Sequence, residues 1–93
     1  MRTYELTCIF RIDEDAYNKG KELVKTLSEK FSSRIVKDED MGVKDLAYEI
    51  KKEAKGHYNY FEIEADPDSV AAMEKEFRLS AHFLKYLFVK KEK

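Results

Sequence analysis

Residues 42–64, GVKDLAYEIKKEAKGHYNYFEIE, carry the pattern that decides the fold prediction. Apolar and polar residues alternate in both halves of this stretch, first in DLAYEI and then in HYNYFEIE. Such alternation is typical of strands with one buried face. The intervening EAKG predicts a short loop, with Gly56 in a left-handed turn position. The stretch is therefore predicted to be a β-hairpin.

The second strand of this hairpin also bears on function, because its run YNYF places three aromatic rings beside a lysine-rich segment. Strand alternation puts Asn59, Phe61 and Ile63 on one face. It puts Tyr58 and Tyr60 on the other. Phe61 and Ile63 suit a core, so we expect the two tyrosines on an exposed face, where such rings favour a binding partner.

The segments on either side of the hairpin predict the remaining elements. Asp13 offers a helix cap, and Asp66 followed by Pro67 is a second helix start. Apolar residues recur at helical spacing after each cap. The predicted elements are a strand over 2–12, a helix over 14–31, a strand that begins near 33 and enters the hairpin, a helix from 66, and a strand over 83–90.

This order, β-α-β-β-α-β, predicts a ferredoxin-like α+β fold. Two crossovers and one hairpin give a four-stranded antiparallel sheet with two helices on one face. The other face stays open, and we expect Ile9, Leu87 and Val89 to lie there near the two tyrosines. An open face with aromatic and aliphatic side chains is a candidate binding surface.

Two glycines interrupt the predicted elements. Gly20 lies inside the first helix, where glycine costs about 1 kcal/mol relative to alanine, and it predicts close packing of the helix on the sheet. Gly42 interrupts an alternating strand and predicts a bulge.

Length and charge bound the class of protein. The chain has 93 residues, which predicts one domain over residues 1–93 with a frayed tail at 90–93. Its 18 basic and 19 acidic residues give a net charge of −1, so global charge does not predict a polyanion partner. The distribution is uneven. Residues 38–45 sum to −3, from four acids and one lysine, and residues 84–93 sum to +3, from four lysines and one glutamate.

The sequence also predicts a compartment. Cys8 is the single cysteine, so it forms no internal disulfide, and its apolar surroundings predict a buried thiol. No stretch approaches the ~20 apolar residues of a membrane span. The polar opening MRTYE predicts no signal peptide. A reducing cytosolic compartment is therefore expected.

No arrangement of residues predicts catalysis, a metal site or a cofactor. His57 and His82 have no cysteine or carboxylate at ligand spacing on a shared element. The consecutive acids Asp38, Glu39 and Asp40 alternate faces in a strand, and nothing nearby would tune one of them for acid–base work. We interpret them as a solvated run that protects an edge strand, and we expect no enzyme.

A stand-alone RNA-recognition module, which binds single-stranded RNA, shares the predicted fold and is the alternative. That module stacks bases on third-strand rings within the pattern K/R-G-F/Y-G/A-F-V-x-F/Y. Lys55 and Gly56 fit the start of this pattern, but His57 and Asn59 stand where it has rings. The aromatic rings of this chain are one position out of register, and such a slip moves them to the other face.

Three stretches of the chain together resemble a known family. They are the opening MRTYE, the middle GVKDLAYEIKK followed by KGHYNYFEIE, and the late FRLSAHFLKYLFVKK. In this order and at these spacings the chain is similar, from end to end, to bacterial-type small-subunit ribosomal protein six. The matching residues are Arg2, Tyr4, Glu5, Gly42, Leu46, Ala47, Tyr48, Ile50, Lys52, Gly56, Tyr58, Arg78 and Leu79.

The chain also departs from the family pattern. Glu49 stands where the family usually has proline, Asp45 where a basic residue is common, and Lys85 where arginine is usual. Asp45 argues against an anion contact at its position. The longer tail of many relatives is missing from this sequence, and we expect weaker partner contacts where that tail would bind.

The resemblance implies a structural protein of the small ribosomal subunit, located in the cytoplasm within the ribosome. Such proteins bind the central domain of small-subunit ribosomal RNA together with a small basic partner, ribosomal protein eighteen of the same subunit. A basic partner fits the acidic run at 38–45, which would attract it and repel RNA. The residues expected to contact RNA are Arg2, Lys52, Arg78 and Lys85. Those expected to contact the partner protein are Tyr48, Tyr58, Tyr60, Glu39, Asp40 and Lys44.

Overall fold

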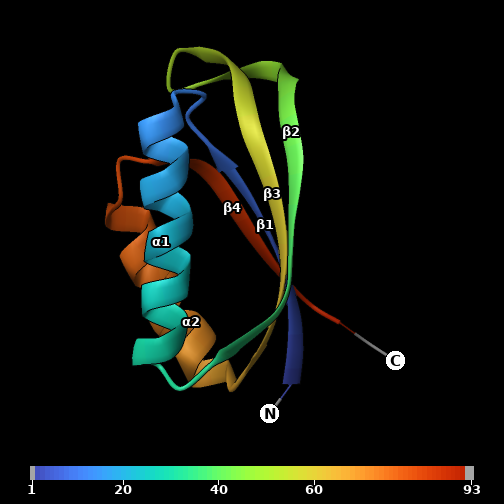
Figure 1. Ribbon diagram of the computed structural model, residues 1–93, viewed down its shortest axis with the longest axis vertical. Helices are drawn as coiled ribbons and strands as arrows, with labels where there is room; N and C mark the ends of the chain where they lie inside the picture. Colours follow the sequence, from blue (N-terminus) through green and yellow to red (C-terminus); the bar gives the residue numbers. More distant parts are fainter. Residues whose placement is uncertain (1, 92–93) are drawn as a thin grey trace.

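The elements follow one another in the predicted order in the computed structural model, which describes residues 2–91. The strands pair in the order β2-β3-β1-β4, and every pairing is antiparallel. Both helices cover one face of the sheet and leave the other open (Figure 1). The ferredoxin-like prediction is therefore confirmed. The elements are β1 (Arg2–Phe10), α1 (Glu14–Lys30), β2 (Arg34–Ile50), β3 (Glu53–Ala65), α2 (Pro67–Leu79) and β4 (Phe83–Lys90).

The core lies between the sheet and the helices, as strand alternation predicts. Leu6, Cys8 and Phe10 of β1 are fully buried, and so are Phe61 and Ile63 of β3, to within 1%. The helices contribute the other half of this core. The buried helix residues in the cluster are Tyr17, Val24, Leu27, Val70, Met73 and Phe77.

Capping residues set where the helices begin. Asp13 precedes α1, and its Oδ1 accepts a hydrogen bond from the Ala16 backbone N–H at 2.8 Å, which satisfies one free donor of the first turn. Pro67 occupies the first turn of α2, where its fixed φ suits the helix and its missing N–H has no consequence. The predicted starts of both helices are confirmed, although the side chain of Asp66 makes no capping hydrogen bond.

Gly20 allows the close packing of α1 on the sheet that its position predicts. A Cβ built on this glycine would lie 2.4 Å from two carbons of the Phe10 ring. Real Cβ atoms do not approach carbon that closely, so the helix could not sit at this distance with a side chain there.

The turn of the β2–β3 hairpin differs from the prediction. Ile50 pairs with Glu53, so the turn consists of Lys51 and Lys52, and EAKG belongs to β3. Gly56 is buried inside that strand and is not a left-handed turn residue. The physical reason is contact rather than turn geometry, because a Cβ on Gly56 would lie 2.3 Å from Ile9 Cγ2.

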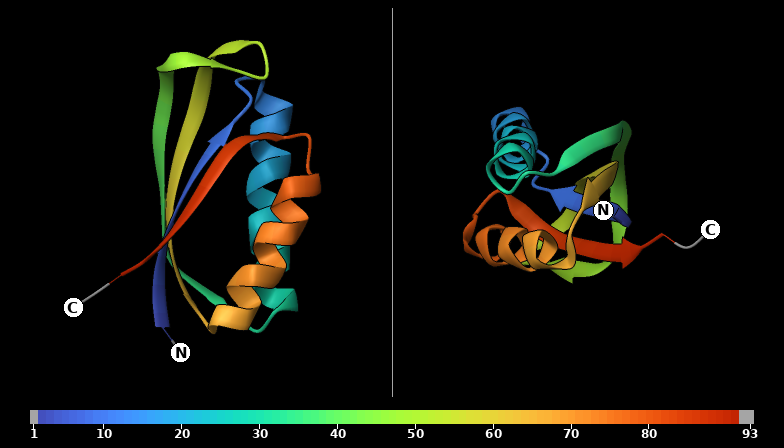
Figure 2. Two further views of the ribbon diagram at one scale, coloured as in Figure 1. Left: turned by 180° about the vertical axis from the view of Figure 1, so that it is seen from behind. Right: turned by 90° about the horizontal axis from the view of Figure 1, so that it is seen from below.

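The end of this hairpin bends away from the regular sheet. The pairing of β2 with β3 shifts between Asp45 and Ile50, and residues 46–49 have no partner in β3. The hairpin tip, defined here as residues 46–53, bends over the end of the sheet where β1 meets α1 (Figures 1 and 2). Ile9 and Leu84 are only 8% and 5% exposed, although neither belongs to the core between sheet and helices.

The bulge predicted at Gly42 is confirmed. The β2–β3 register shifts between Asp40 and Gly42, and Gly42 has a φ of +83°. Two residues of the predicted tail are bonded to β1: Lys90 pairs with Tyr4, and the Lys91 N–H donates to the Thr3 carbonyl at 2.9 Å. Residues 92 and 93 of the predicted tail lie outside the described residues.

Candidate functional site

The sheet face away from the helices, called the open face below, is built from rows of side chains on adjacent strands. In one row Tyr60 of β3 lies between Thr7 of β1 and Glu39 of β2. In the next row Glu62 faces Glu5. Two carboxylates directly opposite one another repel, so this row needs compensating partners.

Tyr60 is one of those partners. Its hydroxyl lies 2.8 Å from Glu62 Oε2 and 3.1 Å from Glu5 Oε2, so it can donate to either carboxylate. Burial together with these two carboxylates raises the pKa of Tyr60, which keeps the hydroxyl a donor. Lys91 Nζ donates to Glu62 Oε1 at 3.1 Å, and Lys37 Nζ lies 5.6 Å from the centre of the Tyr60 ring.

The Tyr60 and Lys91 hydrogen bonds have a second effect, because they lower the pKa of Glu62. The carboxylate of Glu62 is therefore held in its ionised form. The centre of the open face thus combines an aromatic ring with carboxylates that Lys91 and Lys37 compensate in part.

Tyr58 continues the aromatic surface toward the hairpin tip. It is half-buried on β3, between Ile9 of β1 and Gly42 of β2. Lys44 Nζ lies 5.5 Å from the centre of its ring, a cation–π distance. The predicted placement of both tyrosines on the open face is confirmed.

Strand β4 borders the tyrosines with aliphatic side chains. Leu87 is 57% exposed and lies opposite Thr7, and Val89 is 47% exposed and lies opposite Glu5. On the same face, Lys85 Nζ reaches the Tyr48 hydroxyl at 3.5 Å. The open face therefore combines exposed apolar side chains with carboxylates at its centre.

The acidic run of β2 divides between the two faces. Glu39 lies beside Tyr60 on the open face, whereas Asp40 lies beside Asn59 on the helix side. Asp40 Oδ1 accepts the Gly42 N–H at 2.8 Å and lies 2.7 Å from His57 Nε2. These hydrogen bonds, the one with His57 foremost, hold the pKa of Asp40 below its usual range.

A buried polar network on the helix side has no counterpart in the sequence prediction. The Tyr17 hydroxyl donates to Asn59 Oδ1 at 2.8 Å, and Asn59 Nδ2 donates to Asp38 Oδ1 at 2.8 Å. The Tyr17 ring stacks on His57 with centres 3.5 Å apart. Asn59 at a core position was the signal for this network, because a fully buried amide requires partners.

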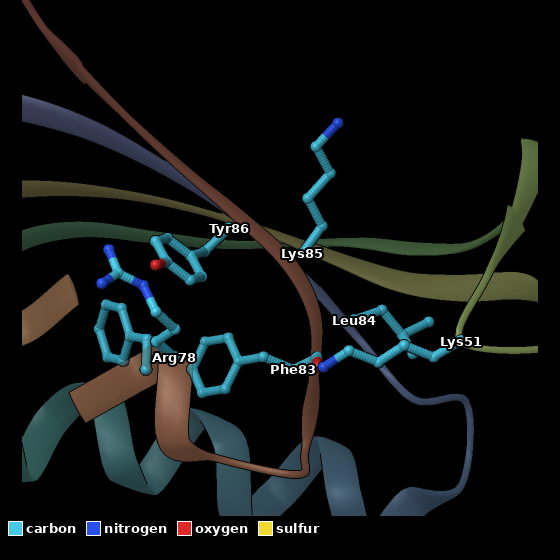
Figure 3. A pocket seen from close by; sticks show the side chains of 7 residues that line it. Lys51, Arg78, Phe83, Leu84, Lys85 and Tyr86 are labelled. Carbon is cyan, nitrogen blue, oxygen red and sulfur yellow. The ribbon is translucent and has the colours of Figure 1, made fainter. Parts of the chain in front are cut away.

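The four cations expected to contact RNA do not form a single cluster. Arg2 begins β1 at one end of the sheet, and Lys52 lies in the turn at the opposite end. Arg78 is in the last turn of α2 and lines a small cavity together with Lys51 and Lys85 (Figure 3). Sequence reasoning did not single out Lys51, which lines this cavity because the hairpin tip bends.

The described residues offer little for chemistry. Residues 2–91 contain no group of three or more histidine, cysteine or acidic side chains placed to hold a metal ion. Cys8 is a free thiol, and burial raises its pKa, which disfavours the reactive thiolate. None of the helices in this part of the chain has the length and apolarity to cross a membrane.

An uncovered sheet face with rings and paired carboxylates, and cations at the margins, defines a small ferredoxin-like protein with a candidate surface for binding another macromolecule. Comparison with known proteins identifies the family within this class. Residues 3–90 match the family model of ribosomal protein S6. The chain therefore belongs to the ribosomal protein S6 family, a family of ribosomal structural proteins rather than enzymes, as the sequence resemblance implied.

Individual relatives agree with this assignment. The chain is 44% identical to small ribosomal subunit protein bS6 of Treponema denticola over 99% of both chains. It is 34% identical to the bS6 protein of Leptospira biflexa over 97% of both chains. The crystal structure of 30S ribosomal protein S6 from Thermotoga maritima superimposes with a TM-score of 0.85 at 26% identity, covering 97% of this chain and 87% of that one.

A further structural similarity concerns the fold alone. The C-terminal domain of the MgtC protein from Mycobacterium tuberculosis has a TM-score of 0.69 at 10% identity, covering 99% of this chain and 89% of that chain. The ferredoxin-like architecture thus also occurs in a differently named protein of low sequence identity, so the fold alone does not identify a function.

Proposed function

We propose that this chain is a structural component of the small ribosomal subunit in the bacterial cytoplasm. In this proposal it binds the central domain of the small-subunit ribosomal RNA together with ribosomal protein eighteen. The observation that carries the proposal is the near full-length similarity to curated small-subunit proteins. The surface of the molecule supports the division of contacts between the two partners.

The open face suits a basic protein better than it suits RNA. Glu5 and Glu62 face one another at its centre, and Glu39 lies in the next row. Lys37 and Lys91 offset part of this negative charge, and the remainder disfavours phosphates and attracts lysine and arginine side chains. Tyr58 and Tyr60 supply rings of the kind that anchor protein interfaces, because they bury a large area at low entropic cost.

RNA contacts fit the cations outside the centre of this face. Arg2, Lys52, Arg78 and Lys85 are all exposed, and each lies in or next to a regular element that holds it in place. Charged side chains on rigid elements are suited to phosphate contacts, which set position rather than sequence preference. Their wide spacing favours a large, folded RNA over a short single strand.

The alternative, a stand-alone RNA-recognition module, has less support. His57 and Asn59, which occupy the ring positions of that module, point toward the helices and take part in the Tyr17 network. The rings that do reach the open face lie beside carboxylates, with Tyr60 bonded to Glu5 and Glu62. A base stacked there would bring its phosphate close to like charge.

Sedimentation tests the proposal. An extract of the native host is fractionated on a sucrose gradient, and each fraction is probed for this chain and for small-subunit ribosomal RNA. We expect most of the chain in the small-subunit peak. The amount at the top of the gradient should not exceed the amount in that peak. A chain found wholly in the soluble fractions contradicts the proposal.

A further inference from the structure

The turn of the hairpin tip places two lysines in a conformation that lysine rarely adopts. Lys51 and Lys52 have φ values of 51° and 67°, both in the left-handed region, between the paired residues Ile50 and Glu53. Two-residue turns of this kind favour Asn-Gly, because these residues tolerate positive φ. Lysine is not favoured at either position, and backbone outliers of this sort are concentrated at functional sites.

The hairpin tip is held firmly against the rest of the molecule. Lys51 Nζ donates to the Phe83 carbonyl at 3.1 Å, so its side chain lies along the beginning of β4 (Figure 3). Arg11 Nη1 lies 3.9 Å from Glu53 Oε1 on the other side of the turn. Leu46 packs near Gly56, whose hypothetical Cβ would lie 3.4 Å from Leu46 Cδ2. The two lysines therefore project from a fixed position.

The polar part of the cavity lining beside Lys51 is cationic. The small cavity beside it, about 100 Å³, is lined by cations from three elements: Lys51 of the tip, Arg78 of α2 and Lys85 of β4. The other lining residues are apolar or aromatic, and no carboxylate is among them. The hydrogen bond to Phe83 uses one of the three Nζ donors of Lys51, so two remain for another acceptor.

The cations do not converge on one point. The Arg78 side chain lies against Tyr86 on one side of β4, and the Lys85 side chain extends on the other side of this strand (Figure 3). A single phosphate ion could not contact all of them. A row of phosphates, as in the backbone of a nucleic acid, could contact them in turn as it passes this corner of the molecule.

We propose that the hairpin tip is a phosphate-backbone clamp, in which Lys51 and Lys52 act with Arg78 and Lys85 on one stretch of RNA. This inference rests on the proposed function and adds Lys51 and the strained turn to it. The hairpin turn itself requires positive φ at both positions, where asparagine and glycine would be less strained, and the proposal assigns the presence of lysine there to phosphate binding.

Two variants of the tip test the proposal. Lys51→Asn combined with Lys52→Gly removes both charges and installs the preferred turn sequence. Lys52→Gly alone keeps the hydrogen bond of Lys51 to Phe83. The matched control is Lys25→Gln combined with Lys30→Gln, which removes two charges from exposed positions on α1. Binding is measured with purified ribosomal protein eighteen and a transcript of the central domain of the ribosomal RNA, at ~50 and ~200 mM salt.

We expect the double tip variant to bind more weakly and with less salt dependence. The ratio of its affinities at the two salt concentrations should shrink by about 3.5-fold for each phosphate that the variant no longer neutralises. Lys52→Gly should raise the midpoint of thermal unfolding by about 4 °C, because glycine relieves the strain. The α1 control should keep the salt dependence of the unmodified protein.

Several outcomes overturn the inference. If the double tip variant keeps the affinity and salt dependence of the unmodified protein, the lysines hold no phosphate. If Lys52→Gly unfolds at a lower temperature than the unmodified protein, folding alone explains the lysine. If the α1 control weakens binding as much as the tip variant does, the effect is one of total charge. If the unmodified protein does not bind the transcript with its partner, both this inference and the proposed function fail.

Discussion

At the scale of single residues, Gly56 shows how one position controls a larger feature. Its hypothetical Cβ approaches Ile9 Cγ2 at 2.3 Å, Leu46 Cδ2 at 3.4 Å and Leu84 Cδ1 at 3.6 Å. These three side chains come from β1, the hairpin tip and β4. Only a residue without a side chain lets them meet, and their packing holds the tip over the end of the sheet.

Gly56→Ala should therefore destabilise the protein. Forcing a methyl group into a packed site costs about 1–3 kcal/mol, and the three neighbouring side chains leave no free space for it. The measurement is the free energy of unfolding from denaturant titration. Because the clash concerns the tip, the variant should also lose protection from amide hydrogen exchange at residues 46–53 before the rest of the sheet does.

Gly42→Ala is the matched comparison for this prediction. Nothing lies within 4 Å of a Cβ at Gly42, but its φ of +83° strains any other residue by about 1 kcal/mol or more. Its effect should be confined to the bulge and leave the tip protected. If Gly56→Ala is as stable as the unmodified protein and its tip is equally protected, the packing assigned to Gly56 is wrong.

At the scale of elements, β3 separates folding from binding by the alternation of its side chains. Phe61 is 1% exposed in the core, whereas Tyr58 and Tyr60 are only partly buried on the open face. Neighbouring residues of one strand thus lie in two environments, the core and the proposed binding surface. The open face keeps its rings in place through hydrogen bonds and flanking cations rather than through a closed core.

The double change Tyr58→Ala and Tyr60→Ala should weaken partner binding far more than stability. Its loss of stability should stay well below the ~3–5 kcal/mol typical of one buried aromatic side chain truncated to alanine. Binding to ribosomal protein eighteen should fall, since central interface rings often contribute ~2 kcal/mol or more each. Denaturant melts and pull-down of the purified partner measure the two effects.

Phe61→Ala is the control from the same strand. It empties part of the core, so it should destabilise strongly, and any decrease in partner binding should follow the decrease in folded protein. The reverse result, with a mild Phe61→Ala and an unfolded double tyrosine variant, would invert the assignment of the two faces. Undiminished partner binding by a folded double tyrosine variant would move the partner off the open face.

At the scale of the whole molecule, the distribution of charge matters more than its sum. The net charge is −1, yet carboxylates occupy the centre of the open face and cations occupy the hairpin tip and the end of β4. Affinity for RNA depends on cations placed on phosphates. Under the proposed function, a basic partner would supply the further cations that tight RNA binding requires.

The free protein should accordingly bind the central-domain transcript weakly, and the addition of ribosomal protein eighteen should produce tight binding. Filter binding with and without the partner, at near-physiological salt, measures this difference. An unstructured RNA of equal length is the control for charge alone. Tight binding of that control by the free protein would favour the RNA-recognition module instead.

The sequence by itself determined the order of the elements, the helix starts and the faces of the strands. These features depend on residues close to one another in the chain. Alternation in HYNYFEIE assigns Tyr60 and Phe61 to opposite faces whatever lies beyond the strand, and Asp13 caps α1 within three residues. The family resemblance likewise depends on local stretches of sequence. The open-face tyrosines of β3 lie where strand alternation places them.

Only the tertiary structure decided where the hairpin turns, what holds Asp40 and which cations come together. Gly56 looked like a turn residue because its partners, Ile9 and Leu84, are far away in the sequence. Asp40 is held by His57 across a strand pair, and Lys51 lines the same cavity as Arg78 because the hairpin tip bends over the end of the sheet. Contacts between distant segments set these features, and local patterns do not encode such contacts.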